Sequence, residues 1–508
     1  MKYFAVVFLC ALLVVTAAAQ TNPSLVATNV VPNGRQMSLQ DCIQQALVHN
    51  LDVQIQRYFP EIDLYNLRGS FGLYDPVLSM SGAHNFNVQP GGFYEGLQLP
   101  SETVKNDDFS SGITGELPFT GLKYDLSGDV NQQHFLQLTN NVPDRTENSA
   151  GSIGIKLTQP LLKNLWIDQG RLTILVNKNT LQYDEQGFRY QVITSVTAVE
   201  NAYYELIFAL ENLKVQQEAL DLSQTQLDQD QQRLTIGTLA ELSVQQDKSQ
   251  VAQNQANLIT AQSTLETDEN TLKNLITDNY SDLHNSDIQP AETLTAPLVL
   301  FNLQDSWSRG MTERPDLIQY RLNVNKVGIQ LKFDRNQLFP ELDVIGTYGW
   351  NGVGEIYNET FGQINQGNAP YYSVGAQLSV PLANQSARNQ VKSDKVSLKQ
   401  VVLKLKQFEQ SVLVGIDNAV KTAQSDYESV DATRQARIYA EAALDAEQRT
   451  YSVGKATTFE VLTYQNNLTA ARGQEIRALA NYEEALANLY AAEGSTLDRL
   501  GINIESTP

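Results

Sequence analysis

The side chains that perform covalent chemistry in proteins are few in this sequence and widely separated. His49, His84, His134 and His284 lie far apart, and no Ser, His and Asp spacing typical of nucleophilic catalysis stands out. Two cysteines in 508 residues supply too little material for a Cys/His metal cluster or a disulfide framework. The sequence also has no glycine-rich phosphate loop of the Walker type. We therefore predict no catalytic site, no cofactor and no metal.

The charge balance narrows the classes of partner. Lys and Arg number 36 against 57 Asp and Glu, which gives a formal net charge of -21 at pH 7. A nucleic-acid-binding surface needs a positive patch, so this composition argues against a nucleic-acid partner. The composition also argues against a disordered acidic chain, because 42% of the residues are apolar and only 18% are charged.

The first twenty residues carry the features of an export signal. A short apolar run precedes Ala17 and Ala19, which give the small-x-small pattern of a cleavage site before Gln20. The run is shorter than the ~20 residues of a spanning helix, so 1–19 is predicted to be a cleaved signal peptide. An uncleaved N-terminal membrane anchor is the alternative. No later apolar run reaches about 18 residues, the length that a spanning helix needs. The mature chain is therefore expected to enter a membrane only as strands.

The sequence contains an internal duplication. Leu39-Gln40-Asp41 recurs as Leu303-Gln304-Asp305, the segment 154–161 is echoed by 375–382, and finally Gly237 matches Gly454. Similar segments in the same order indicate two copies of one structural unit. The predicted divisions are an extended N-terminal segment (20–37), a first structural repeat (38–278), a linker (279–301), a second structural repeat (302–495) and a C-terminal tail (496–508).

Each repeat is predicted to open with a helix and to continue into strands. Ser38 and Asp41 form a capping-box-like start, and Pro60 is expected to kink or interrupt the helix that follows. Further along, apolar residues alternate with small or polar ones, which is the period of a strand with two different faces. Strands are predicted at about 76–88, 149–161, 340–352 and 371–382, marked by Pro76, Pro160, Pro340 and Pro381.

Two very long helices follow the strands. The runs over 170–236 and 386–453 contain no proline, and each spans about 67 residues, or ~100 Å. Gly237 and Gly454 then mark the turns into a returning helix in each repeat. Apolar residues at every seventh position predict coiled-coil packing of these hairpins. In the first hairpin they are Leu213, Leu220, Leu227, Leu234, Val244, Val251, Leu258, Leu265 and Leu272; the returning helices are predicted at about 240–278 and 457–493.

The order of these features resembles the TolC-type outer-membrane efflux channels. The signal peptide, the strand ending in Gln159-Pro160-Leu161, the glycine-turned hairpins and the duplication together cover about 38–495. The resemblance implies an α+β membrane protein, in which the duplicated unit of long coiled-coil helices plus β-strands forms a trimeric transmembrane β-barrel continued by an α-helical periplasmic tunnel. It also implies four strands per protomer in a twelve-stranded barrel. Closure by symmetric copies agrees with physics, because lipid does not tolerate open sheet edges.

The resemblance implies a function without covalent chemistry. The protein would be the outer-membrane exit duct of a tripartite efflux or type I secretion system in a Gram-negative-type bacterium, with its helices in the periplasm. The implied partners are two further copies in a homotrimer, outer-membrane lipid, an inner-membrane pump or ABC transporter, and a periplasmic adaptor (membrane fusion protein). The adaptor would dock around the hairpin tips near Gly237 and Gly454. The cargo is selected largely by the pump.

The first repeat departs from the family pattern between its two predicted strands. The segment 89–148 separates them, whereas the second repeat has only some twenty residues at this place. Within it, 112–121 followed by 123–130 has the pattern of an additional hairpin. We expect this hairpin to lie outside the barrel as an extracellular loop element. The alternative is that it adds strands to the barrel.

In the family the tunnel narrows at the inner tips, where acidic residues form a ring and a tyrosine and an arginine make locking contacts. By position, Tyr451 matches the locking tyrosine and Glu460 matches the outer ring aspartate. Three such carboxylates around a narrow pore would favour cations and raise one another's pKa. An ordinary solvated helix charge is the alternative for Glu460. The other gate candidates depart from the family's residue types: Thr463 at the second acidic position, Lys455 beside the arginine position, Ser243 at the acidic partner's position and Glu241 two residues before it.

Two other classes of protein stay open at this point. A periplasmic adaptor also has a long hairpin, but normally a single one between lipoyl-like and β-rich halves rather than a tandem duplication. A secreted coiled-coil adhesin or structural protein would not need alternating strands at matched places in two repeats. Fractionation separates these classes, since a heat-sensitive outer-membrane trimer indicates the channel and a soluble monomer excludes it.

Overall fold

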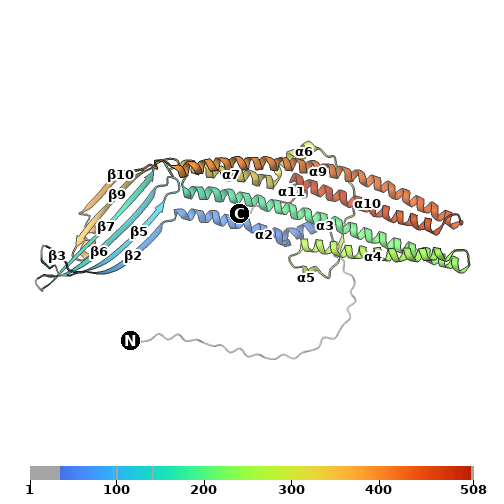
Figure 1. Ribbon diagram of the computed structural model, residues 1–508, viewed down its shortest axis with the longest axis horizontal. Coiled ribbons are helices and arrows are strands. Elements are labelled where there is room, and N and C mark those ends of the chain that lie inside the picture. Colours follow the sequence, from blue (N-terminus) through green and yellow to red (C-terminus); the bar gives the residue numbers. More distant parts are fainter. Residues whose placement is uncertain (1–34, 95–96, 99–100, 140–141, 505–508) are drawn as a thin grey trace, which may run out of the picture.

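The computed structural model describes residues 35–94, 97–98, 101–139 and 142–504. The protein is elongated, with a β-sheet at one end and the turns of two helical hairpins at the other (Figure 1). The predicted signal peptide, with Ala17, Ala19 and Gln20, lies outside the described residues, as does 20–34 of the predicted N-terminal segment.

The first repeat begins with two helices, α1 (Leu39–His49) and α2 (Leu51–Ser70). The interruption expected at Pro60 lies earlier, at Asn50, whose side-chain oxygen accepts the N–H groups of Asp52 and Val53 at 3.0 and 3.2 Å and so caps α2. Pro60 itself lies inside α2. The remaining elements of this repeat are the 3₁₀ turn Phe71–Tyr74, β2 (Val77–Gln89), β3 (Phe93–Tyr94), β4 (Leu97–Gln98), β5 (Glu102–Glu116), β6 (Lys123–Thr139), β7 (Val142–Pro160), α3 (Gln169–Thr235) and α4 (Glu241–Ile276).

The second repeat has the same plan with two strands in the large sheet instead of four. Between the repeats, β8 (Ile288–Pro290) pairs in parallel with β1 (Arg35–Met37) of the N-terminal segment. The elements of the second repeat are α6 (Leu303–Glu313), α7 (Pro315–Asn336), β9 (Glu341–Gly354), α8 (Tyr357–Gln366), β10 (Pro370–Ser379), α9 (Gln385–Ser452) and α10 (Thr458–Glu493). The elements outside the repeats are β1 (Arg35–Met37), α5 (Tyr280–Leu283), β8 (Ile288–Pro290) and α11 (Thr496–Leu500).

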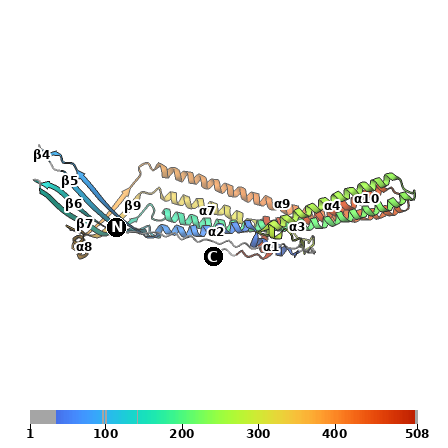
Figure 2. The same ribbon diagram turned by 90° about the horizontal axis from the view of Figure 1, so that it is seen from below.

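Four helices form a row that continues the sheet. α2 packs on α3, α3 on α7 and α7 on α9, so this is their order along the row (Figures 1 and 2). α3 and α9 have 67 and 68 residues, and each turns back through α4 or α10 as a hairpin. β2, β7, β9 and β10 join the four helices in the same order as the row. Among the described helices, none is both long enough and apolar enough to cross a membrane.

The large sheet has six antiparallel strands in the order β10-β9-β7-β6-β5-β2. β5 and β6, which come from the segment 89–148, are inserted between β2 and β7. Every residue of β2 pairs with β5, from Val77 opposite Thr114 to Gln89 opposite Glu102. The inserted hairpin is therefore part of the large sheet and not a separate loop element, and the chain contributes six strands to this sheet where four were expected. The continuous ladders explain the placement, because they satisfy backbone groups that a separate hairpin would leave unpaired.

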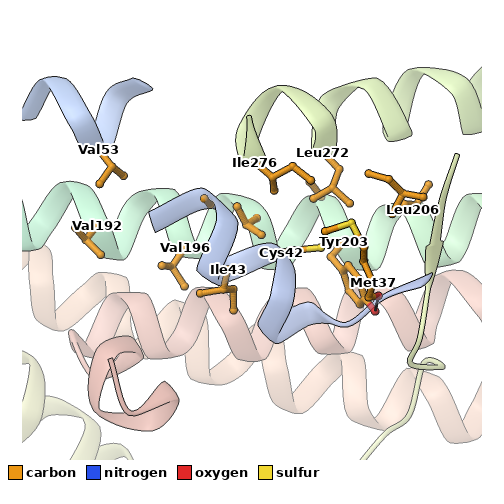
Figure 3. Close-up of a cluster of buried hydrophobic side chains, with 14 of the residues drawn as sticks. Met37, Cys42, Ile43, Val53, Val192, Val196, Tyr203, Leu206, Leu272 and Ile276 are labelled. Carbon is orange, nitrogen blue, oxygen red and sulfur yellow. Dashed lines mark hydrogen bonds between the residues drawn. The ribbon is translucent and has the colours of Figure 1, made fainter. Parts of the chain in front are cut away.

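Of two clusters of buried apolar side chains, the smaller one joins α9 and α10, and the larger one lies in the middle of the molecule, where the linker and α1 pack on α3 and α4 (Figure 3). Tyr203, Leu206 and Leu272 are fully buried there together with Ile43. The Tyr203 hydroxyl donates a hydrogen bond to the carbonyl oxygen of Met37 at 3.1 Å and also contacts Glu292 of the linker. This core fixes the base of the first hairpin, while the two tips extend away from it.

Candidate functional site at the hairpin tips

Both hairpins turn at a glycine in the left-handed region of backbone space. Gly237 has φ +79° and Gly454 has φ +74°, a conformation that residues with a Cβ rarely adopt. The Gly237 N–H donates to the carbonyl of Leu234 at 2.9 Å, and the Gly454 N–H donates to that of Tyr451 at 3.0 Å. The turns therefore close the ends of α3 and α9 in the same way.

The helices that return from the two turns begin differently. At the start of α10, the Glu460 carboxylate accepts hydrogen bonds from the backbone N–H and the hydroxyl of Thr457, at 2.7 and 2.9 Å. The Glu460 N–H donates back to the Thr457 hydroxyl at 3.3 Å, which completes a capping box. These hydrogen bonds lower the pKa of Glu460, which is exposed to solvent. By contrast, the N-cap residue of α4 is Ala240, which offers no side-chain cap.

Tyr451 joins the two hairpins through a buried carboxylate. Its hydroxyl lies 2.7 Å from both carboxylate oxygens of Asp230 on α3 and 3.1 Å from the hydroxyl of Thr458. The guanidinium of Arg233 lies over the Tyr451 ring, 4.7 Å from its centroid, and 3.8 Å from Asp230. Gln226 donates a further hydrogen bond to Asp230 at 3.0 Å. The polar contacts of Asp230 therefore come from both hairpins.

A second carboxyl group lies against the first. Asp230 and Asp247 are both fully buried, one on α3 and one on α4. Burial, and then the charge of Asp230, raises the pKa of Asp247 to about 7. Among the described residues no donor group reaches either carboxyl oxygen of Asp247. Protonation of Asp247 removes the cost of placing two buried charges side by side, so the cluster can respond to pH.

The other predicted gate residues lie close to this cluster in sequence but outside it. Glu241 and Ser243 are in the first turn of α4, and no hydrogen bond in the described part of the chain joins either side chain to Tyr451, whose hydroxyl contacts Asp230. The Thr463 hydroxyl donates to the carbonyl of Phe459 at 2.8 Å, within its own helix. Lys455 is exposed beside the turn glycine.

The four proline markers lie at the other end of the molecule. Pro76 and Pro340 directly precede β2 and β9, Pro160 is the last residue of β7, and Pro381 follows β10. All four are at the junctions between sheet and helices, where a strand begins or ends. Among the described residues, no group of three or more His, Cys, Asp or Glu side chains could hold a metal ion.

Asp230 and Asp247 are absent from the predicted gate, although the sequence carries a signal for them. Each follows an apolar residue of the seven-residue repeat by three positions, Leu227 in one case and Val244 in the other. That is the second core position of a coiled coil, where an acidic residue is costly unless it has a specific role. Two acidic residues at equivalent core positions on facing helices are a pattern that sequence reading could have used.

Known proteins share this fold and parts of this sequence. A sequence profile described as outer membrane efflux protein matches residues 125–277 and 309–495, one segment in each repeat and together two thirds of the chain. The outer membrane protein TolC of Escherichia coli (strain K12) is 25% identical over 321 residues. That alignment covers 62% of this chain and 63% of TolC, which is less than two thirds of the relative.

Solved structures agree over more of the chain. The outer membrane protein VceC of Vibrio cholerae superposes with a TM-score of 0.65 at 16% identity, covering 90% of this chain and 96% of VceC. The CmeC outer membrane channel of Campylobacter jejuni gives a TM-score of 0.64 at 13% identity, covering 95% and 94%. These likenesses confirm the fold class that the sequence predicts. With the profile matched in both repeats, the chain belongs to the outer membrane efflux protein family.

Proposed function

We propose that the protein is the outer-membrane exit duct of a tripartite efflux or type I secretion system, built from three copies of this chain. The observation that carries the proposal is the division of the sheet into an apolar and a polar face. Residues directly opposite each other in an antiparallel ladder share a face. One such row crosses all six strands with exposed apolar side chains: Leu78, Ile113, Leu126, Ile155, Tyr348 and Tyr372.

The opposite face of the sheet is polar. Ser81 and Ser110 share a hydrogen bond at 2.7 Å, and the Ser152 hydroxyl donates to Asp129 at 2.5 Å. With Asn351, these four residues form one row across β2 to β9. An apolar outer face and a polar inner face are the pattern of a transmembrane barrel wall around water.

The protomer has two lateral edges at which further copies of the chain could pack. β2 and β10 are the end strands of the sheet, and α2 and α9 are the ends of the helix row. Ile55, Tyr58 and Ile62 are exposed on α2, as are Val396 and Leu403 on α9. Sheet edges and apolar helix edges on the same sides favour a ring of identical chains, in which no edge is left open.

The hairpin tips are the proposed docking site of a periplasmic adaptor. Four large apolar side chains flank Gly237 and Gly454 and are between 64% and 73% exposed: Ile236, Leu242, Val453 and Phe459. They occupy equivalent positions in the two repeats, two residues for each turn. Exposed apolar side chains at both tips suit a periplasmic adaptor that covers the end of the tunnel. The inner-membrane pump or ABC transporter would act through this adaptor.

The Tyr451 cluster is the proposed element that holds the tunnel end narrow. Breaking its contacts with Asp230 would let the two hairpins separate, because the cluster provides buried polar contacts between them at this level. Glu460, Thr463, Lys455, Glu241 and Ser243 remain gate candidates near the same tips. Of these, Glu460 has the exposure that a pore carboxylate needs, while its capping box suits a structural role.

Fractionation and channel recording test the proposed function. The native protein should be found in the outer membrane as a trimer that dissociates to monomers on heating, and it should conduct ions in a planar bilayer. A strain lacking the gene should lose export of at least one compound among dyes, detergents and metals. Recovery of the native protein as a soluble monomer would contradict the proposal.

A further inference from the structure

The inserted strands β5 and β6 carry the same two-faced pattern as the rest of the sheet. Ile113 of β5 and Leu126 of β6 continue the apolar row, opposite Leu78 of β2 on one side and Ile155 of β7 on the other. On the other face, Ser110 and Asp129 continue the polar row. The alternation is therefore in register with both neighbours of the insertion.

This register distinguishes a barrel wall from a hairpin in water. A hairpin outside the membrane has water on both faces, so nothing requires its exposed apolar residues to align with those of β2 and β7. The side chains of the apolar row are 38 to 81% exposed in the protomer, and the two on inserted strands are 38% and 45% exposed. β5 and β6 have 15 and 17 residues, more than the ~9–11 that a transmembrane strand needs.

We propose that β5 and β6 are wall strands, so that three copies of this chain close an eighteen-stranded barrel rather than the family's twelve-stranded one. The proposal rests on the trimeric duct proposed above. β2 leads away from the helices and β10 returns to them, so β2 of one copy meets β10 of the next in antiparallel orientation. Their apolar residues, such as Leu78 and Tyr372, then continue on one face around the ring.

The consequence is a wider exit. Barrel diameter grows almost linearly with strand number, and strands ~4.8 Å apart at a tilt of ~40° give about 24 Å for twelve strands and about 35 Å for eighteen. A ring of twelve helices spaced ~9 Å apart is also about 35 Å across. At this tilt, an eighteen-stranded barrel would match the ring of twelve helices in width.

Lipid exposure of single side chains tests the proposal without deleting anything. In a Cys42→Ala background, Leu126→Cys and Ser127→Cys place a fluorophore on the two opposite faces of β6, one residue apart. Phospholipids with a nitroxide on the acyl chain should quench the label at position 126 in the reconstituted trimer. The label at position 127 should instead be quenched by iodide from the aqueous side.

Matched variants on β7 separate this proposal from the proposed function. Ile155→Cys and Ser152→Cys lie on the apolar and polar rows of a strand that belongs to the wall with or without the insertion. Equal quenching by lipid at positions 126 and 155 supports eighteen strands. Quenching at 155 but not at 126 overturns this inference and leaves the duct intact, whereas absence of quenching at both overturns the membrane sheet itself.

Disulfide formation gives a second, independent readout. The pair Ser81→Cys and Ser110→Cys joins β2 to β5, where the two serine oxygens lie 2.7 Å apart. The pair Ser81→Cys and Ser152→Cys joins β2 to β7, which are adjacent only if the inserted hairpin leaves the wall. Oxidation of the membrane-embedded trimer should link the first pair and not the second. The reverse result would contradict the eighteen-stranded barrel.

Discussion

The two repeats share a plan but differ at both ends of the molecule. At the sheet end, the first repeat contributes four strands and the second contributes two. At the tip end, the first hairpin buries Asp230 and Asp247, while the second supplies Tyr451, which contacts one of them. The duplicated frame of helices and glycine turns therefore sets the length of the molecule. The differences between the repeats set the number of strands that each contributes to the sheet and the chemistry of the tips.

Deleting Glu102–Thr139 makes the two repeats alike at the sheet end and should have the largest effect. With β2 paired directly to β7, the trimer would have twelve strands, and the barrel diameter should fall from about 35 Å to about 24 Å. Electron cryo-microscopy of the trimer measures this diameter. A trimer of unchanged diameter would show that β5 and β6 are not wall strands.

Tyr451→Phe removes the shorter of the two hydrogen-bonding contacts from the second hairpin to Asp230; the other comes from the Thr458 hydroxyl at 3.3 Å. Hydrogen bonds to charged groups contribute about 1.5–3 kcal/mol, so exchange of the backbone amides in the last turns of α3 should be about 10- to 100-fold faster. Hydrogen exchange measured by mass spectrometry checks this. Tyr439→Phe, on the exposed surface of α9, is the matched control and should change nothing. Equal protection in both variants would mean that the contact does not hold the hairpins together.

Asp247→Asn removes the group that titrates at the first tip and should flatten the pH dependence of stability. The pKa of Asp247 rises from an ordinary value of 3.8 to about 7, so the folded state holds a proton that the unfolded chain releases. Its contribution to stability is therefore present below pH ~4 and is lost as the pH rises toward 7. The melting temperature should fall between pH 5 and pH 8 in the native protein, and should fall less in Asp247→Asn.

Three further carboxyls keep part of this pH dependence in the variant. The pKa values of Asp184 and Asp394 are each raised to about 6 and that of Glu484 to about 7, mainly by burial. Asp228→Asn removes an exposed carboxylate from α3 and serves as the control for the change in net charge. If Asp228→Asn flattens the profile as much as Asp247→Asn does, the buried pair is not the titrating element.

Glu460→Gln should have the smallest structural effect, because glutamine also completes a capping box with Thr457. The substitution removes the negative charge and keeps the cap, so a change in ion selectivity would show that the Glu460 carboxylate faces the pore. We expect lower cation selectivity and weaker block by multivalent cations in a planar bilayer. Asp431→Asn, at an exposed position far from the tips on α9, gives the baseline. Unchanged selectivity of Glu460→Gln would assign Glu460 to helix capping alone.

Structural features that depend on residues close together in the sequence were predictable from the sequence. The glycine turns follow from the left-handed conformation that glycine permits, and the long helices follow from proline-free runs with sevenfold apolar spacing. The helix break is the exception, because the Asn50 side chain caps a new helix and Pro60 is accommodated inside it. Both residues are compatible with a break, and local preference alone could not rank them.

The sequence by itself determined the duplication, the hairpins and the family, because repeats and periodic patterns are written in the order of the residues. Only the tertiary structure decided that β5 and β6 enter the sheet and that Tyr451 contacts Asp230. The physical reason is the same in both cases. The order of the strands and the contacts between the hairpins both depend on segments that are far apart in the chain. Strand pairing and side-chain burial select these arrangements, and no short stretch of sequence specifies them.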